Sequence, residues 1–292
     1  MTPPTVIQWA LDTRNLWPEA KETKELSHVA SRAMSLLSPS EQSAVLRYYF
    51  VKDAKLSLGS SLLKRLAICR FCRVPWADAT STRDERTKPV FLMPADGSEP
   101  LLFNISHQAG VVVLFAVHLP PPGLAIGVDI VCVGERRERD HQIIKQEGWA
   151  HFLAIHDEVL CPREVQRLRY LPIKDVDKLL EYFYALWCLR EAYVKMTGEA
   201  LLAAWLPELE MKYYSPPGEA PPEGADKYLE VWFKGAKVTD VEVKLERELD
   251  DEYMISTVTR KGTDGRGVEV GKFEVLDLES LLDEAEELKA TF

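Results

Sequence analysis

The pattern of apolar and polar positions predicts a chain in which helices and strands are intermixed. Apolar residues recur at helical spacing over two long stretches, residues 48–71 and about 175–197. Apolar runs and period-two alternation predict strands at 5–11, at 126–131, and on both sides of a tight turn within 103–117. Because these elements show no regular βαβ repetition, we predict the α+β fold class.

The second long helix carries polar groups along one stripe. Asp175 and Asp177 are suitable N-cap residues, and Gly198 suits the position just after the last turn. Trp187, Glu191 and Lys195 follow one another at intervals of four, so they share one side of the helix. Taken alone, this pattern favours an ordinary surface ion pair worth about 0.2–0.5 kcal/mol.

The first long helix is preceded by a helix-start signal. Ser38 is followed by a proline and by Glu41, which together predict a capping box. We expect a break in the helical pattern near residues 59–61, which read Gly-Ser-Ser. Cys69 and Cys72 form a C-x-x-C, but no second Cys or His pair stands at zinc-site spacing, so we predict two buried or half-buried thiols on a helix.

Two short stretches between apolar segments are suited to ligand binding. Residues 106–108, including His107, are predicted to lie in a turn between two strands, with Gly110 supplying backbone freedom. A surface histidine without a role is the simpler interpretation of His107. Lys88, next to a proline in a polar loop, could reach a phosphate, although taken alone this position favours a solvated loop lysine.

Asp129 stands in the middle of an apolar strand. Residues 127, 129 and 131 share one face of that strand, since side chains alternate with period two. Aspartate is depleted in strands, and a buried carboxylate needs a partner for its charge. A divalent cation and a nearby Lys or Arg satisfy this requirement about equally well.

Proline-rich stretches organise the chain. Residues 120–123, Pro-Pro-Pro-Gly, predict a stiff linker, so we expect an N-terminal half of 1–123 and a C-terminal half of 124–292. Residues 133–147 are polar and predicted to be weakly ordered, and the Pro/Gly-rich stretch 215–226 is predicted to be a mobile excursion.

Composition narrows the classes of partner. The chain of 292 residues is 46% hydrophobic, has a net charge of −10, and contains no apolar run long enough to span a bilayer. The negative charge argues against nucleic acid or anionic membrane as a partner. Five cysteines and an N-terminus unlike a secretory signal predict reduced thiols and a cytoplasmic location. Basic residues cluster between 47 and 88, which suits a small polyanionic ligand or an acidic partner.

Three motifs give the chain a family resemblance. The sequences FNISH at 103–107, GVDI at 127–130 and WCLREAYVK at 187–195 resemble the N-I-S-H, G-[IV]-D-I-E and W-x-x-K-E-[AS]-x-x-K signatures of the Sfp-type 4′-phosphopantetheinyl transferases. The resemblance extends from Tyr48 to Gly198. It is strongest to the larger eukaryotic members, particularly those of filamentous fungi.

The resemblance implies a fold and an activity. The family fold is a monomer of two similar α+β halves related by a pseudo-twofold, with coenzyme A and Mg²⁺ in the cleft between them. The implied enzyme moves phosphopantetheine from coenzyme A to a serine of an apo carrier domain and releases 3′,5′-ADP. The implied partners are carriers of polyketide, peptide and fatty acid synthases and of aminoadipate reductase.

The resemblance also assigns roles to residues. Asp129 and Glu191 are expected to hold Mg²⁺, and Lys195 to contact the pyrophosphate and neutralise the leaving group. Glu191 is our candidate for the base that takes the serine proton, directly or through a metal-bound water. The residues expected to bind coenzyme A are Arg47, Arg86, Lys88, Asn104, Ser106, His107 and Lys195. Among them, Ser106 and His107 are expected to bind the region of the 3′-phosphate, with Lys88 nearby.

The chain departs from the family pattern at several positions. Val131 stands where many members have Glu, and Arg190 replaces the usual Lys before Glu191. Glu41 and Ala44 stand where some bacterial members have lysines, and the candidates to replace those lysines are Arg47, Lys52 and Lys55.

Other functions remain as alternatives. A non-catalytic partner of a synthase that binds coenzyme A or a nucleotide would not need a carboxylate pair beside a lysine. A structural domain with a salt-bridged helix leaves Asp129 and the His107 turn unexplained. An enzyme dedicated to one fatty acid carrier is usually half as long and trimeric, so the resemblance favours the broad-specificity type.

Overall fold

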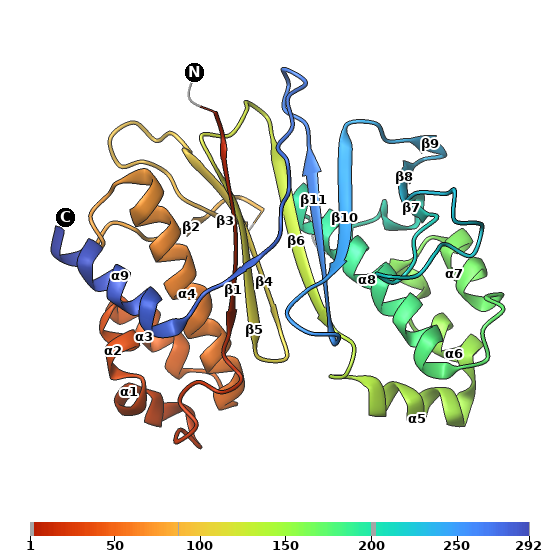
Figure 1. Ribbon diagram of the computed structural model, residues 1–292, viewed down its shortest axis with the longest axis horizontal. Helices are drawn as coiled ribbons and strands as arrows, with labels where there is room; N and C mark the ends of the chain where they lie inside the picture. Colours follow the sequence, from red (N-terminus) through yellow and green to blue (C-terminus); the bar gives the residue numbers. More distant parts are fainter. Residues whose placement is uncertain (1–2, 87, 200–202, 292) are drawn as a thin grey trace. The chain divides into compact units, whose positions relative to one another are not determined.

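The computed structural model describes residues 3–86, 88–199 and 203–291, which form two compact units (Figure 1). Unit 1 consists of Met1–Pro122 and Val268–Phe292, and unit 2 of Gly123–Gly267. The predicted C-terminal half, 124–292, includes residues 268–292, whereas in the structure these residues belong to unit 1.

A four-stranded sheet forms one layer of unit 1, in the order β12-β1-β5-β4. The pairs β1/β5 and β4/β5 are antiparallel, while β12 runs parallel to β1. A separate short hairpin joins β2 and β3. The strand bounds are β1 Thr5–Asp12, β2 Thr82–Arg83, β3 Pro89–Val90, β4 Leu101–Gln108, β5 Val111–His118 and β12 Glu274–Val275.

Helices cover one face of this sheet (Figure 1). The longest is α4, Val51–Cys72, and the others are α1 Leu26–Val29, α2 Ser31–Ser35, α3 Pro39–Leu46 and α9 Leu278–Thr291, with a 3-10 turn at Thr23–Glu25. Ser38 and Glu41 form the predicted capping box at the start of α3. Cys69 is buried and Cys72 half-buried on α4, as predicted.

The predicted break in the first long helix is wrong, because α4 is continuous through Gly59. A Cβ atom at Gly59 would lie 3.1 Å from Leu11 Cδ2 and 3.4 Å from Val112 Cγ2. The glycine therefore lets the helix approach β1 and β5 closely, and this packing outweighs the roughly 1 kcal/mol helix-propensity cost of glycine relative to alanine.

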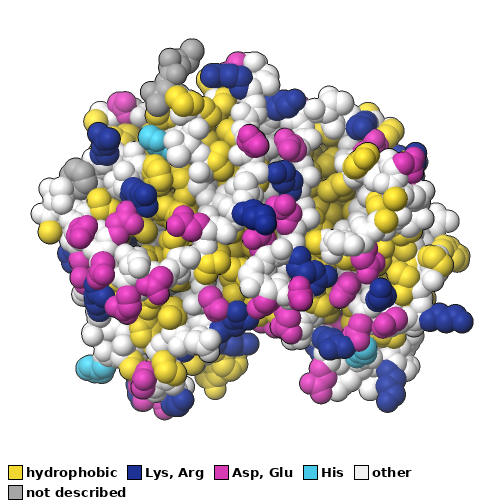
Figure 2. Space-filling model, in the orientation of Figure 1, with side chains coloured by type: hydrophobic (Ala, Val, Ile, Leu, Met, Phe, Trp, Pro, Cys, Tyr) yellow, Lys and Arg dark blue, Asp and Glu magenta, His cyan; other side chains and the backbone are white. Residues whose placement is uncertain are grey.

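The C-terminal segment is held in unit 1 by pairing and by charge. Trp9 and Ala10 of β1 pair with β12, and the Gln8 side chain exchanges two hydrogen bonds with the Gly271 backbone. Acidic side chains gather along α9 (Figure 2), and Arg32 binds three of them, Glu279, Asp283 and Glu286. These long-range contacts could not be read from the local pattern, and they explain why the division at residue 123 misplaces this segment.

Unit 2 contains an antiparallel sheet in the order β10-β11-β6, with α8 packed against β6 and β11 (Figure 1). A second antiparallel sheet has the order β7-β8-β9. The strands are β6 Ala125–Cys132, β7 Leu209–Lys212, β8 Glu230–Phe233, β9 Ala236–Lys237, β10 Val241–Arg247 and β11 Tyr253–Arg260. The helices are α5 Arg137–Glu147, α6 Trp149–Ala154, α7 Pro162–Arg169 and α8 Val176–Thr197, with 3-10 turns at Asp157–Val159 and Leu206–Glu208.

The stretch predicted to be weakly ordered, 133–147, contains helix α5 instead. Side-chain contacts with α8 stabilise this polar helix. The Tyr184 hydroxyl donates to Asp140 Oδ2 at 2.6 Å, and both Arg137 and His141 pair with Asp177.

The Pro/Gly-rich stretch 215–226 is irregular, and ion pairs fasten it to unit 2. Lys178 pairs with Glu219 at 3.3 Å, and Arg167 pairs with Glu223 at 2.7 Å. Its predicted mobility stays a prediction.

Each unit therefore combines a largely antiparallel sheet with one helix of 22 residues, α4 or α8. This mixed architecture confirms the prediction of an α+β chain built from two similar halves. Within the described residues, no helix combines the length and the apolar character that crossing a membrane requires.

Candidate active site

Helix α8 presents three half-exposed side chains on an otherwise buried segment. The helix starts after Asp175, whose carboxylate accepts a hydrogen bond from the Asp177 N–H, and ends at Gly198 with φ of 76°. Every side chain from 182 to 196 is buried except those of Trp187, Glu191 and Lys195. The predicted helix is confirmed, and its stripe at intervals of four is the side of α8 that remains accessible.

Strand β6 lies directly beneath α8 because Gly127 has no side chain. A Cβ atom at this position would lie 2.1 Å from the Ala192 carbonyl oxygen and 2.6 Å from the Met196 nitrogen. The close approach brings Asp129, two residues further along the same strand face, to Lys195. Lys195 Nζ lies 2.6 Å from Asp129 Oδ1, an ion pair between residues 66 apart in the sequence.

Glu191 and Asp129 are two carboxylates close to the same lysine, Lys195. Burial, and then the negative charge of Asp129, raise the pKa of Glu191 to about 7, against the opposing effect of Lys195. Asp129 is more deeply buried than Lys195, with side-chain exposures of 8% and 28%. Two carboxyl groups so close together could share a divalent cation.

The two carboxylates suit Mg²⁺ better than a metal ion whose ligands are all protein side chains. Among the described residues there is no group of three or more His, Cys, Asp or Glu side chains able to hold a metal. Mg²⁺ is commonly bound by one or two carboxylates, with waters and substrate phosphate oxygens completing its coordination. Asp129 and Glu191 match this pattern.

Arg190, the departure next to Glu191, points away from this site. It is 2% exposed, and its Nη1 lies 2.7 Å from Oε2 of Glu164, which is fully buried on α7. It also donates to the carbonyls of Leu206 and Leu209. Arg190 joins α8 to α7 and to the start of β7, where its planar fork serves several acceptors at once.

The other predicted site residues lie in unit 1, and three of them share strand β4. Asn104 and Ser106 are buried, while His107 is exposed. The prediction that residues 106–108 form the turn is wrong, because β4 pairs with β5 as far as Gln108 opposite Val111. The turn is Ala109–Gly110, where both residues have positive φ.

Arg86 and Lys88 lie in the loop between β2 and β3. The backbone N–H groups of both donate to Asp84 Oδ1, at 2.9 and 2.8 Å, and this shapes the loop. The Arg86 side chain is exposed and that of Lys88 half-buried. Burial lowers the pKa of Lys88, against opposing effects of Glu99 and Asp84.

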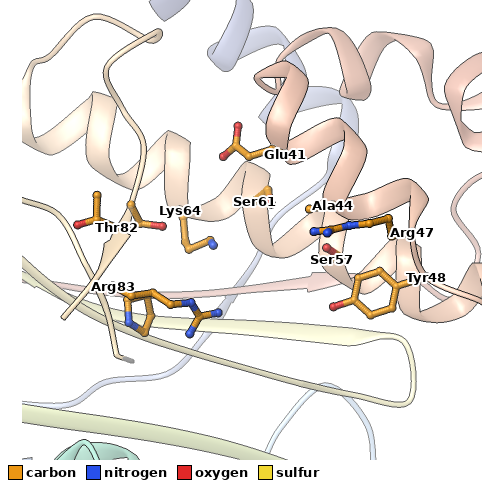
Figure 3. A pocket seen from close by; sticks show the side chains of 11 residues that line it. Glu41, Ala44, Arg47, Tyr48, Ser57, Ser61, Lys64, Thr82 and Arg83 are labelled. Atoms are coloured by element: carbon orange, nitrogen blue, oxygen red, sulfur yellow. The ribbon is translucent and has the colours of Figure 1, made fainter. Parts of the chain in front are cut away.

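Arg47 lines a pocket of about 470 Å³ in unit 1 (Figure 3). Lys52 and Lys55, the other candidates to replace the missing lysines, are not among the described residues that line it. The lining residues are Glu41, Ala44, Arg47, Tyr48, Ser57, Ser61, Lys64, Ser81, Thr82, Arg83 and Pro89.

Two cations of this pocket, Lys64 and Arg83, were not singled out from the sequence. Both belong to the basic region between 47 and 88, but nothing in that composition separated them from its other lysines and arginines. The signal that could have found Lys64 is its spacing from Ser57 and Ser61, since intervals of seven and three place all three on one side of a helix.

Comparisons with known proteins agree with the sequence motifs. A family described as "4′-phosphopantetheinyl transferase, N-terminal" matches residues 24–119, and the "4′-phosphopantetheinyl transferase superfamily" matches residues 125–249. The 4′-phosphopantetheinyl transferase 1 of Fusarium mangiferae is 56% identical, covering 96% of this chain and 94% of that protein.

More distant relatives show the same family. A 4′-phosphopantetheinyl transferase of Aureobasidium melanogenum is 32% identical, covering 93% of this chain and 95% of that protein. The human L-aminoadipate-semialdehyde dehydrogenase-phosphopantetheinyl transferase is 26% identical, covering 58% of this chain and 50% of that protein. The predicted resemblance is confirmed: this chain belongs to the 4′-phosphopantetheinyl transferases, of the type found in fungi.

Proposed function

We propose that this protein is a 4′-phosphopantetheinyl transferase that moves phosphopantetheine from coenzyme A to a serine of an apo carrier domain. The main support for the proposal is that Asp129, Glu191 and Lys195 lie close together at the accessible side of α8. Family membership supplies the reaction, and these residues supply groups that suit it.

The reaction needs charge neutralisation and a proton acceptor. The serine oxygen bonds to the phosphorus that bears pantetheine, the bond from that phosphorus to the bridging oxygen breaks, and 3′,5′-ADP leaves with the electron pair. Phosphoryl transfers of this kind depend mainly on positioning and on stabilising negative charge. We assign Lys195 to the pyrophosphate, where its ammonium offsets the charge that develops on the leaving group.

Glu191 is the proposed general base. A base works best when its pKa lies near the working pH, and the pKa of Glu191 is raised to about 7 by burial and by Asp129. Its half-exposed position leaves it accessible to the serine hydroxyl of a carrier.

Asp129 and Glu191 are also the proposed Mg²⁺ ligands. When bound, the ion would polarise the pyrophosphate as a Lewis acid and add positive charge beside the two carboxyl groups. Asp129 sits on a buried strand and accepts from Lys195, so its carboxylate is held in place before substrate arrives.

The remaining assignments concern the substrate and its carriers. We propose that Arg47, Arg86, Lys88, Asn104, Ser106 and His107 contribute to coenzyme A binding. The proposed acceptors are carrier domains of polyketide, peptide and fatty acid synthases, and also of aminoadipate reductase, which the name of the human relative supports. We propose a monomer that works in the cytoplasm, where the five free thiols stay reduced.

The intact mass of a carrier domain tests the function. An apo carrier incubated with this protein, coenzyme A and Mg²⁺ is expected to gain one phosphopantetheine group, and to gain nothing without coenzyme A or after chelation of the metal. Carriers that stay unmodified although coenzyme A binds would contradict the proposal and favour a non-catalytic binding protein.

A further inference from the structure

Strand β11 places one polar side chain on an apolar face, directly beside Asp129. Ser256 lies opposite Asp129 in the antiparallel pairing of β11 with β6. Directly opposite residues project from the same face of a sheet, with Cβ atoms about 4.5–5.5 Å apart. Met254 and Val258, which share this face with Ser256, pack in the hydrophobic core that α8 covers. Ser256 therefore lies beneath α8, next to the Asp129 side chain.

The Ser256 hydroxyl is buried without a hydrogen bond. Ser256 is 0% exposed, and among residues 3–86, 88–199 and 203–291 its Oγ has no hydrogen-bond partner. A buried polar group without a partner lowers stability, and such groups are rare in folded proteins. Alanine would fill nearly the same space without this penalty. Close packing against α8 therefore explains a small residue at this position, but it does not explain the hydroxyl.

The acceptors around Ser256 are the backbone of two strands and the Asp129 carboxylate. Cys188 Sγ, on α8, lies 3.5 Å from the carbonyl oxygens of both Asp129 and Met254, so this thiol covers the backbone where β6 meets β11. The Asp129 carboxylate is the side-chain acceptor that the strand register brings beside Ser256. An ionised carboxylate offers about four acceptor positions, so Asp129 can accept from a hydroxyl as well as from Lys195. A change of the Ser256 χ1 angle between staggered rotamers redirects the hydroxyl.

Substrate binding changes the demands on Lys195. Its Nζ donates to Asp129 Oδ1 at 2.6 Å, and we also assign it to the pyrophosphate. The lysine is half-exposed on a flexible side chain, whereas Ser256 is fixed on a buried strand. Carboxylates that bind metals are usually oriented by hydrogen bonds from neighbouring groups. A donor at Ser256 would keep Asp129 oriented when Lys195 turns to the substrate.

We infer that Ser256 is a positioning residue: when coenzyme A and the divalent cation bind, its hydroxyl donates a hydrogen bond to the Asp129 carboxylate and holds it toward the cation. This inference rests on the proposed function, in which Asp129 is a Mg²⁺ ligand. Ser256 is inaccessible to solvent and acts only through Asp129. Because Val131 stands where a third carboxylate is common, two carboxylates must hold the ion, and the orientation of each one matters more.

The test uses the near-isosteric variant Ser256→Ala, with Mg²⁺ titrated by calorimetry into the protein saturated with coenzyme A. Loss of a group that orients a metal ligand typically weakens metal affinity by about 10–100-fold, so the Kd for Mg²⁺ is expected to rise by about this factor. The Mg²⁺ concentration that gives half of the maximal transfer rate should rise with it, while the rate at saturating Mg²⁺ stays close to that of the wild type. Coenzyme A binding without metal is expected to stay unchanged.

The stability of the ligand-free protein separates positioning from packing. Because Ser256→Ala removes a buried hydroxyl that has no partner among the described residues, the Tm without coenzyme A and metal is expected to be unchanged or higher. Thr257→Val is the matched control, since Thr257 is buried next along β11 but lies opposite Val128 and faces away from Asp129. This control is expected to keep the wild-type Kd for Mg²⁺.

An unchanged Kd for Mg²⁺ in Ser256→Ala, or no Mg²⁺ binding by the wild type, would overturn the inference. A lower Tm of ligand-free Ser256→Ala, or an equal rise of the Kd in Thr257→Val, would overturn it as well, because the hydroxyl would then have a general structural role. If Ser256→Ala selectively weakens Mg²⁺ binding but the wild type modifies no carrier, the inference holds and the proposed transferase function fails. If the wild type modifies carriers and Ser256→Ala binds Mg²⁺ equally well, only the inference fails.

Discussion

Two of the ion pairs that helix α8 makes with other elements differ in almost every respect. Arg190 and Glu164 are both inaccessible to solvent, and each makes further hydrogen bonds to backbone groups. Lys195 and Asp129 are joined by a contact of similar length, but the lysine is half-exposed and a second carboxylate, Glu191, stands beside them. The first pair is enclosed by its surroundings, while the second stays accessible through the lysine.

This difference shows that neighbouring residues on one helix can have separate roles, one in structure and the other in chemistry. Arg190 and Glu191 are consecutive, so their side chains point in directions about 100° apart around the helix axis. Arg190 therefore lies in the packed interior, and Glu191 lies on the accessible side. The usual lysine before the glutamate could be replaced by Arg190 because that position serves packing. The following variants separate the two roles.

The largest effect is expected on catalysis when the base is removed. Glu191→Gln keeps the shape of the side chain but cannot accept the serine proton, so the transfer rate should fall by about 10²–10⁴-fold while coenzyme A still binds. Single-turnover transfer to a carrier measures this, with Glu181→Gln on the same helix as the control expected to retain the wild-type rate. A rate within a few-fold of the wild type would exclude Glu191 as the base.

The largest effect on stability is expected at the closed pair. Arg190→Ala leaves the Glu164 carboxylate buried without its cation, which should lower the free energy of unfolding by about 3–5 kcal/mol. Urea denaturation followed by tryptophan fluorescence measures this loss. Arg190→Lys should lower the free energy of unfolding less than Arg190→Ala does. A loss below about 1 kcal/mol for Arg190→Ala would mean that the pair is not structural.

An intermediate effect is expected where α8 meets β6. Gly127→Ala places a Cβ about where the Ala192 carbonyl oxygen lies, so α8 must shift, at a cost of about 1–3 kcal/mol. The shift should also reduce transfer, because it separates Lys195 from Asp129. Gly134→Ala is the matched control, since the nearest atom to its Cβ is the flexible end of Glu252 at 3.2 Å. Equal behaviour of the two variants would contradict this account of the contact.

The smallest effect is expected at the exposed start of α8. The Arg137 and His141 side chains hold the pKa of Asp177 at about 2, below its ordinary value of 3.8. Because the folded pKa is the lower one, the stabilisation is complete above pH 3.8 and is lost as pH falls through about 2. Asp177→Asn should therefore lower the Tm slightly at pH 7, and the difference should shrink at pH 3. A difference that grows on acidification would have the wrong sign.

Local signals in the sequence predicted local structure well. Helix α8 and its stripe followed from a capping aspartate, a terminal glycine and regular apolar spacing, and three short motifs were enough to identify the family. The same local reasoning failed at Gly59, where tertiary packing against Leu11 and Val112 overrides the helix-breaking tendency of glycine.

Contacts between residues far apart in the sequence could not be predicted from local patterns. The partner of Asp129 could have been a cation or a basic residue, and only the fold shows that it is Lys195, 66 residues away. The return of residues 268–292 to unit 1 likewise depends on Arg32 and on pairing with β1. The placement of Lys64 in a pocket required the positions of three separate elements, which no local pattern encodes.

The most direct test of the central claim is Mg²⁺-dependent modification of one carrier domain, measured by intact mass, with Asp129→Asn and Arg190→Lys compared side by side at a temperature where both are folded. We predict that Arg190→Lys modifies the carrier and that Asp129→Asn does not, although Asp129→Asn still binds coenzyme A. Full modification by Asp129→Asn would contradict the account, because the pair of Asp129 and Lys195 would then not belong to the site of transfer.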